Sequence, residues 1–285
     1  MGASNIHVCH SAALFGLAQA MHTLPTTPRL FSNRLRAASK AFALHLGIST
    51  IVALLAAWLV LGIWFAYPLR SLAGGQHLFW TLVGVDMVCG PLLTLVLFNP
   101  AKSLRELRLD LSLVALVQLA ALAYGLYSIS LARPVIQAFE TDRFAVVSAA
   151  EVDPDQLQQA LPALRTLPWN GPRLVGVRLP RDGNETLYSI ELSLQGVEPS
   201  ARPGWWQPYK QSIPAIQKRM KKLADLRSAR PAAEQALIDQ AVRKTGQPLE
   251  ALFYLPLTSR KNLDDWIVLL NGEATIVGYA PVSGF

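Results

Sequence analysis

A lone carboxylate in an apolar segment has the clearest potential for chemistry in this chain. Asp86 lies near the middle of residues 77–98, which contain no other Asp, Glu, Lys or Arg. An ionised carboxylate at the centre of a bilayer costs about 2.5–3.5 kcal/mol, so its presence there requires an explanation. Pro91 follows Gly90 and removes one backbone donor, which predicts a kink in the same helix.

Two interpretations of Asp86 remain open. One is a proton or ion relay, which would make the chain a small ion- or proton-coupled membrane transport component centred on Asp86. The other is a protonated carboxyl group that hydrogen-bonds to another helix, either within the chain or in a partner. We favour the second, because transporters usually carry several such residues and more spans. Gln118 and Tyr124 are the candidate partners, since helical rise places Tyr124 at a similar depth to Asp86.

A second candidate site is an aromatic segment flanked by prolines. Arg202, Trp205, Trp206 and Tyr209 fall within eight residues. Trp and Tyr are favoured at protein–protein interfaces, so these residues are a candidate protein-binding loop. The equal alternative is a loop that folds onto the core of its own domain.

No pattern of a catalytic, cofactor or metal site is present. All five histidines and both cysteines lie before residue 90, which removes His- and Cys-based nucleophile pairs and ordinary zinc sites from the rest of the chain. No Walker loop or dinucleotide-binding glycine pattern occurs. We therefore expect a protein that is not an enzyme and has no cofactor.

These candidate residues belong to two contrasting halves. The first 132 residues hold only 8 of the 26 Lys and Arg and 3 of the 19 Asp and Glu, and the mean hydropathy of the chain is +0.29. A spanning helix needs about 20 apolar residues. Three segments meet this length, and together they predict a three-helix transmembrane domain over residues 41–132: Ala41–Tyr67, His77–Phe98 and Leu111–Ala132.

Basic residues predict the orientation of these spans. Seven Lys and Arg lie before the first span or between the second and third, and Arg70 alone lies between the first and second. Cytoplasmic flanks are enriched in Lys and Arg. We therefore expect a cytoplasmic arm over residues 1–40, disordered at its start, and a periplasmic domain over residues 133–285. The net charge of +7 then reflects membrane orientation, so no nucleic acid partner is expected.

The second half has the charge content of a globular domain. Its patterns predict an α+β fold with an antiparallel sheet. Asp182 and Glu185 suit the start of a helix that ends before Gly196, and the apolar stripe of this helix contains Leu187, Ile190 and Leu194. Further helices are predicted over residues 213–229, with Ser212 as N-cap, and 231–245. Asn271-Gly272 predicts a type I′ turn joining two C-terminal strands. The predicted strands are 134–139, 143–149, 173–180, 251–257, 266–270 and 274–280.

The chain also resembles a known family. Residues 84–98 and 110–153 are similar to type IV pilin accessory proteins of the TfpZ type, most specifically at Asp86, Gly90-Pro91, Gln118, Arg133-Pro134 and Asp142-Arg143-Phe144. The resemblance covers roughly residues 35–285, and the arm before residue 35 departs from the pattern. It implies a multi-pass inner-membrane protein of a piliated Gram-negative bacterium, which influences pilus assembly or dynamics. The implied partners are type IV pilin or the pilus assembly machinery, together with the lipid bilayer.

Overall fold

The computed structural model describes residues 28–65, 69–72, 75–99 and 102–285. These residues form two compact units. One contains residues up to 47 together with 89–116, and the other contains residues 48–88 together with 117–285. The predicted disorder of the N-terminal arm, and Cys9, lie outside the described residues.

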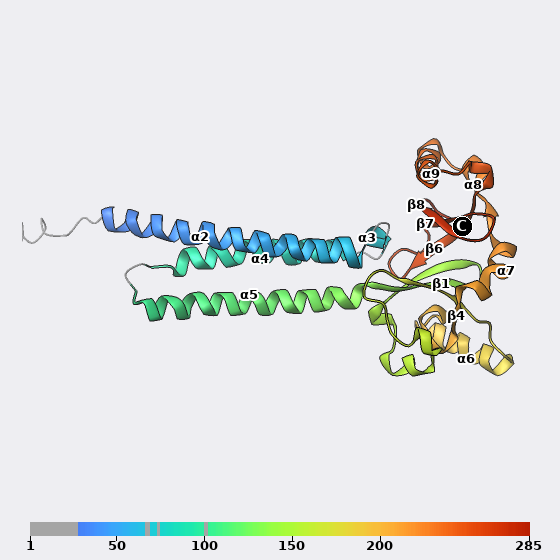
Figure 1. Ribbon diagram of the computed structural model, residues 1–285, viewed down its shortest axis with the longest axis horizontal. Helices are drawn as coiled ribbons and strands as arrows, with labels where there is room; N and C mark the ends of the chain where they lie inside the picture. Colours follow the sequence, from blue (N-terminus) through green and yellow to red (C-terminus); the bar gives the residue numbers. More distant parts are fainter. Residues whose placement is uncertain (1–27, 66–68, 73–74, 100–101) are drawn as a thin grey trace, which may run out of the picture. The chain divides into compact units, whose positions relative to one another are not determined.

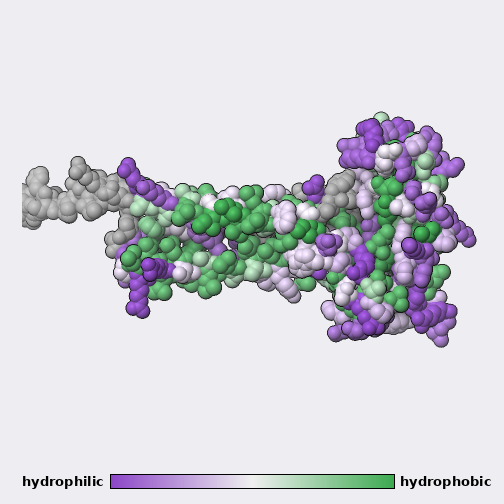
Figure 2. All heavy atoms as spheres, in the orientation of Figure 1, coloured by the Kyte–Doolittle hydropathy of each residue, from purple (hydrophilic) through white to green (hydrophobic). Residues whose placement is uncertain are grey.

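The N-terminal half consists of long apolar helices (Figure 1): α2 (Pro28–Ala57), which continues as the π-helix η1 (Trp58–Trp64), the short α3 (Leu69–Leu72), α4 (Gly75–Leu97) and α5 (Leu104–Ala132). Within the described residues, three helical stretches are long and apolar enough to cross a membrane: Leu35–Trp64, Phe79–Leu97 and Leu104–Ala132. Apolar side chains cover these helices in Figure 2. The three predicted apolar helices are confirmed, although α2 and α5 begin before the predicted spans.

The π-helix aligns the packing residues at the end of the first apolar stretch. The Phe65 N–H donates to Val60 O at 2.8 Å, one residue further back than in an α-helix. Val60, Trp64 and Phe65 are consequently all buried, with exposures of 0–3%. They pack with Phe79 of α4 and Ile129 of α5, so the ends of three helices share one apolar cluster.

The C-terminal half contains a mixed sheet with the order β4-β3-β1-β2-β6-β7-β8, and β5 pairs with β6. Its strands are β1 (Pro134–Glu140), β2 (Arg143–Ser148), β3 (Arg173–Val177), β4 (Trp206–Pro208), β5 (Lys221–Lys222), β6 (Phe253–Ser259), β7 (Trp266–Leu270) and β8 (Ile276–Ala280). The prediction of an antiparallel sheet is wrong in two places, because β1–β3 and β2–β6 are parallel. Parallel neighbours need long crossover connections, and the segments that separate these strands in sequence supply them.

Both faces of the sheet are covered around β7. Val268 and Leu270 join the apolar cluster of Phe144 and Ile216, whereas Ile267 and Leu269 join the cluster on the other face. All five residues of β7 are buried, which explains why this strand is apolar throughout rather than alternating.

The predicted helix over residues 213–229 is wrong as one element. The structure has α7 (Tyr209–Arg219) and α8 (Leu223–Ser228), separated by β5. Lys221 and Lys222 pair with β6, and the Leu223 N–H donates to Leu252 O, which interrupts the helix. Ser212 is not an N-cap, because it lies inside α7. Its hydroxyl packs so closely on β3 that a Cβ at Gly176 would overlap it.

Other local predictions have mixed outcomes. The helices α6 (Gly183–Leu194) and α9 (Ala232–Thr245) form as predicted, and Asp182 caps α6 by accepting from the Glu185 N–H at 2.8 Å. The C-terminal hairpin also forms, but its type I′ turn does not. Asn271 closes a longer loop with Thr275, and the residue with positive φ is Ala274 (59°).

Candidate functional site

The surroundings of Asp86 contain one of its two predicted partners. Asp86 is half-buried on α4, and the Gln118 side chain of α5 donates through Nε2 to the backbone carbonyl of Asp86 at 3.2 Å. The contact therefore involves the main chain rather than the carboxylate. Tyr124 is 73% exposed, so its ring lies on the outer surface of α5. This geometry joins two apolar helices through a side-chain amide.

The part of α4 after Asp86 buries a glycine, a proline and a threonine. Gly90 and Pro91 are buried, and the helix continues through the proline to Leu97. Thr94 is buried three residues later, and its Oγ1 lies 2.5 Å from Nδ1 of His45 on α2. Sequence reasoning missed this pair, although a histidine inside an apolar span was a visible signal that a polar partner was needed.

The aromatic segment is folded into the domain. Trp205 and Trp206 are 8% and 3% exposed, and Trp206 Nε1 donates to Ser200 O at 2.7 Å. The Tyr209 hydroxyl donates to Ala274 O at 2.5 Å, and burial raises the pKa of this tyrosine to about 12. Of the two alternatives left open by the sequence, the structure favours a loop packed on the core. Because Arg202, Trp205 and Trp206 are all buried, these three side chains do not form an exposed binding surface.

Arg202 is the centre of a buried polar cluster. Its guanidinium donates to Ser189 Oγ at 2.7 Å and Ser189 O at 2.8 Å, and to Val197 O at 2.6 Å. Burial lowers the pKa of Arg202, while the nearby Glu140 and Glu198 act in the opposite direction. Ser189 belongs to α6 and Val197 follows it, so one arginine secures the C-terminal end of this helix to the domain.

A second arginine secures the other end of α6. Arg178, directly after β3, makes a bidentate ion pair with Glu185, with N–O distances of 2.9 and 2.6 Å. This hydrogen bonding, and a further bond from the Arg181 N–H, lower the pKa of Glu185 to about 2. The guanidinium groups of Arg178 and Arg202 lie 4.6 and 5.1 Å from the ring centroid of Trp205. We call Arg178, Arg202 and Trp205 the arginine clamp.

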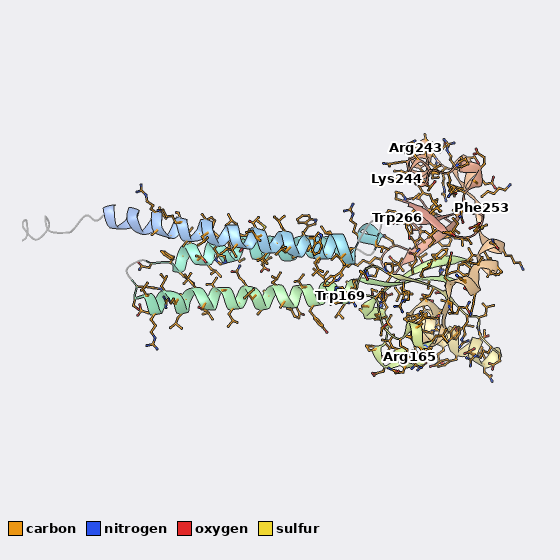
Figure 3. All side chains as sticks on the ribbon, viewed as in Figure 1. Arg165, Trp169, Arg243, Lys244, Phe253 and Trp266 are labelled. Atoms are coloured by element: carbon orange, nitrogen blue, oxygen red, sulfur yellow. The ribbon has the colours of Figure 1, made fainter. Side chains whose placement is uncertain are left out.

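A third cluster lies where the apolar helices end. Trp169, which is labelled in Figure 3, is 59% exposed and makes an edge-on contact with Trp64 at 5.3 Å between ring centroids. The Arg133 guanidinium lies 5.3 Å from the same Trp169 ring. Trp64 lies three residues before the end of the first predicted span and Arg133 directly follows the third, but Trp169 is remote from both in sequence, so spacing alone did not reveal the cluster. Aromatic residues at this position are typical of a membrane–water interface.

Metal-binding chemistry is not suggested by the described part of the chain. Among those residues, no three His, Cys, Asp or Glu side chains are grouped so that they could hold a metal ion. The clusters around Arg202, Arg178 and Trp169 instead combine hydrogen bonds, ion pairs and ring contacts between elements. Their common effect is to fix helices against each other or against the sheet.

The architecture defines a class of protein in which three apolar helices precede a mixed-sheet domain. The chain belongs to the fimbrial assembly protein FimB family, whose family model matches residues 33–74. It is 36% identical over 248 residues to the fimbrial assembly protein of serogroup E1 from Dichelobacter nodosus, an alignment that spans 87% of this chain and 96% of that protein.

Two further relatives come from the same organism. The serogroup I fimbrial assembly protein is also 36% identical over 248 residues, with the same coverage of both chains. The fimbrial assembly protein of serogroups C1 and C2 is 42% identical over 123 residues, which make up 43% of this chain and 94% of that protein. No solved structure matches the chain.

Proposed function

We propose that this chain is a non-enzymatic inner-membrane accessory factor of type IV pilin, of the TfpZ type, which acts in pilus assembly or dynamics. The observation that carries the proposal is its 36% identity to a named fimbrial assembly protein over 96% of that protein's length. Three apolar helices and a C-terminal mixed-sheet domain suit a factor that contacts pilin or the pilus machinery both within and outside the bilayer.

The proposed membrane arrangement follows the basic residues. Residues 1–40 form a cytoplasmic arm, residues 41–132 span the bilayer three times, and residues 133–285 form a periplasmic domain. The residues around the start of α5 support the cytoplasmic side, because Lys102, Arg105 and Arg108 are all basic; Asp110 offsets part of this charge by pairing with Lys102 at 2.5 Å. The Trp64–Trp169–Arg133 cluster suits the opposite, periplasmic interface.

An assembly role is tested by counting surface pili in a strain that lacks the chain and in the same strain with the chain restored. We expect pilus number to fall in the deletion strain and to recover on restoration. Unchanged pilus number after deletion would contradict the proposal.

The alternative, ion-coupled transport, depends on Asp86. We propose a helix-contact role for its carboxyl group instead, because Asp86 is half-buried where α4 lies against α5, as the bond from Gln118 of α5 to the Asp86 backbone carbonyl shows. Asp86→Asn keeps the shape and hydrogen-bonding capacity of the side chain but cannot carry a proton. At matched protein levels, Asp86→Asn should leave pilus number near normal and Asp86→Leu should reduce it. Equal defects in both strains would favour ion coupling.

A further inference from the structure

The helix α6 presents its apolar side chains to solvent. Leu187, Ile190 and Leu194, which the sequence predicts as one stripe, are 68%, 54% and 84% exposed, and Tyr188 beside them is 55% exposed. The buried residue of this helix is a serine, Ser189. An amphipathic helix ordinarily turns its apolar stripe toward the core.

The arginine clamp explains how this inverted orientation is held. Arg202 binds Ser189 and the chain after α6, and Arg178 binds Glu185 near its start. The anchoring contacts are thus hydrogen bonds and ion pairs on the polar side of the helix. The apolar stripe contributes little burial to the fold, which leaves it available for another molecule. A grouped apolar surface of this kind commonly marks an interaction site.

The charges around the stripe specify what it can bind. Glu191 is exposed and lies among the stripe residues, four positions after Leu187 and three before Leu194. Asp182 and Glu198 are exposed before and after the helix. A carboxylate that is covered by a partner needs a cation to offset its desolvation. The complementary surface is therefore apolar and carries a Lys or Arg.

We propose that the exposed stripe of α6 (Leu187, Ile190 and Leu194) binds an apolar helical segment of a partner protein, with a Lys or Arg of that segment paired to Glu191. A second copy of this chain is a poorer occupant, because two-fold pairing of α6 with itself would bring two Glu191 carboxylates together. An anionic membrane surface is also a poorer occupant, because it would meet the carboxylates of Asp182, Glu191 and Glu198. Only the expectation that this partner belongs to the pilus system rests on the proposed function.

The test uses the full chain in nanodiscs and two fluorescent synthetic helices as probes. Both peptides carry one leucine face, and they differ only in having lysines or glutamates beside it. Fluorescence anisotropy, corrected with empty nanodiscs, should show at least tenfold tighter binding of the lysine peptide. Leu187→Ser/Leu194→Ser should weaken that binding at least tenfold. Leu263→Ser is the matched control, because Leu263 is 69% exposed elsewhere in the domain, and it should have no effect.

Charge reversal separates the proposal from its competitors. Glu191→Lys should reverse the preference, so that the glutamate peptide binds more tightly. Equal binding of both peptides by the unaltered chain would overturn the proposal. Leucine-dependent dimerisation, or leucine-dependent binding to phosphatidylglycerol vesicles, without a peptide preference would overturn it in favour of a second copy or a membrane. A deletion strain that loses its pili while the peptides show no preference would retain the proposed function and reject this surface.

Discussion

The helices α6 and α9 both have an apolar and a polar face, but α9 buries its apolar face and α6 exposes it. Both are amphipathic, and Figure 1 shows them near opposite ends of the strand order, α6 by β4 and α9 by β8. Ile238 of α9 is fully buried in the cluster of Leu252 and Ile267, whereas Leu194 of α6 is 84% exposed. The difference lies in what the domain offers: an apolar sheet face at α9, and two guanidinium groups at α6. Periodicity predicts that a helix has two faces, but the surface opposite decides which face is buried.

The largest expected effect comes from truncating one apolar side chain in each of the two helices. Ile238→Ala should lower the free energy of unfolding by about 2–5 kcal/mol, since it leaves a cavity in the core. Leu194→Ala should change it by less than about 0.5 kcal/mol, since the side chain is in solvent. Urea unfolding of the domain in the full chain, followed by tryptophan fluorescence, would measure both. Similar losses for the two variants would show that α6 buries its stripe after all.

A smaller effect should follow from removing the clamp. Arg202→Met fills similar space but removes the hydrogen bonds that Arg202 donates to the buried Ser189 hydroxyl and carbonyl, which costs about 1–3 kcal/mol. Amide hydrogen exchange should accelerate in α6 more than in α9. Arg243→Met on the exposed side of α9 is the control. Equal acceleration in both helices would contradict a local anchoring role for Arg202.

The elements that local patterns define were predictable. Length and apolar composition gave the three N-terminal helices, and Asp182 with Glu185 gave the start of α6. The pairing of β5 with β6, and the parallel pairs in the sheet, were not predictable, because they depend on residues far apart in sequence. The same limit applies to the sites. The aromatic segment was recognisable, but Trp206 packs in a cluster with Val175 and Trp205 stacks with Arg178, and no spacing rule connects these partners to the segment.

The ion pair at the start of α6 should give a pH-dependent contribution. The folded protein lowers the pKa of Glu185 from 4.5 to about 2, mainly through its hydrogen bonds to Arg178. Between these values the unfolded chain binds a proton that the folded chain does not, so stability falls as pH falls. Melting temperatures between pH 6 and pH 2 should decline less for Glu185→Gln than for the unaltered chain. Parallel declines would mean that this pair does not stabilise α6.

The most direct test of the central claim, that α6 turns its apolar stripe outward to act in pilus assembly, is surface pilus number with the stripe removed. The strain would carry Leu187→Ser/Leu194→Ser in place of the unaltered chain, and a second strain would carry Leu263→Ser. At matched protein levels we expect pilus number in the first strain to fall toward that of the deletion strain, and the second strain to be normal. Normal pilus number in the first strain would contradict the account.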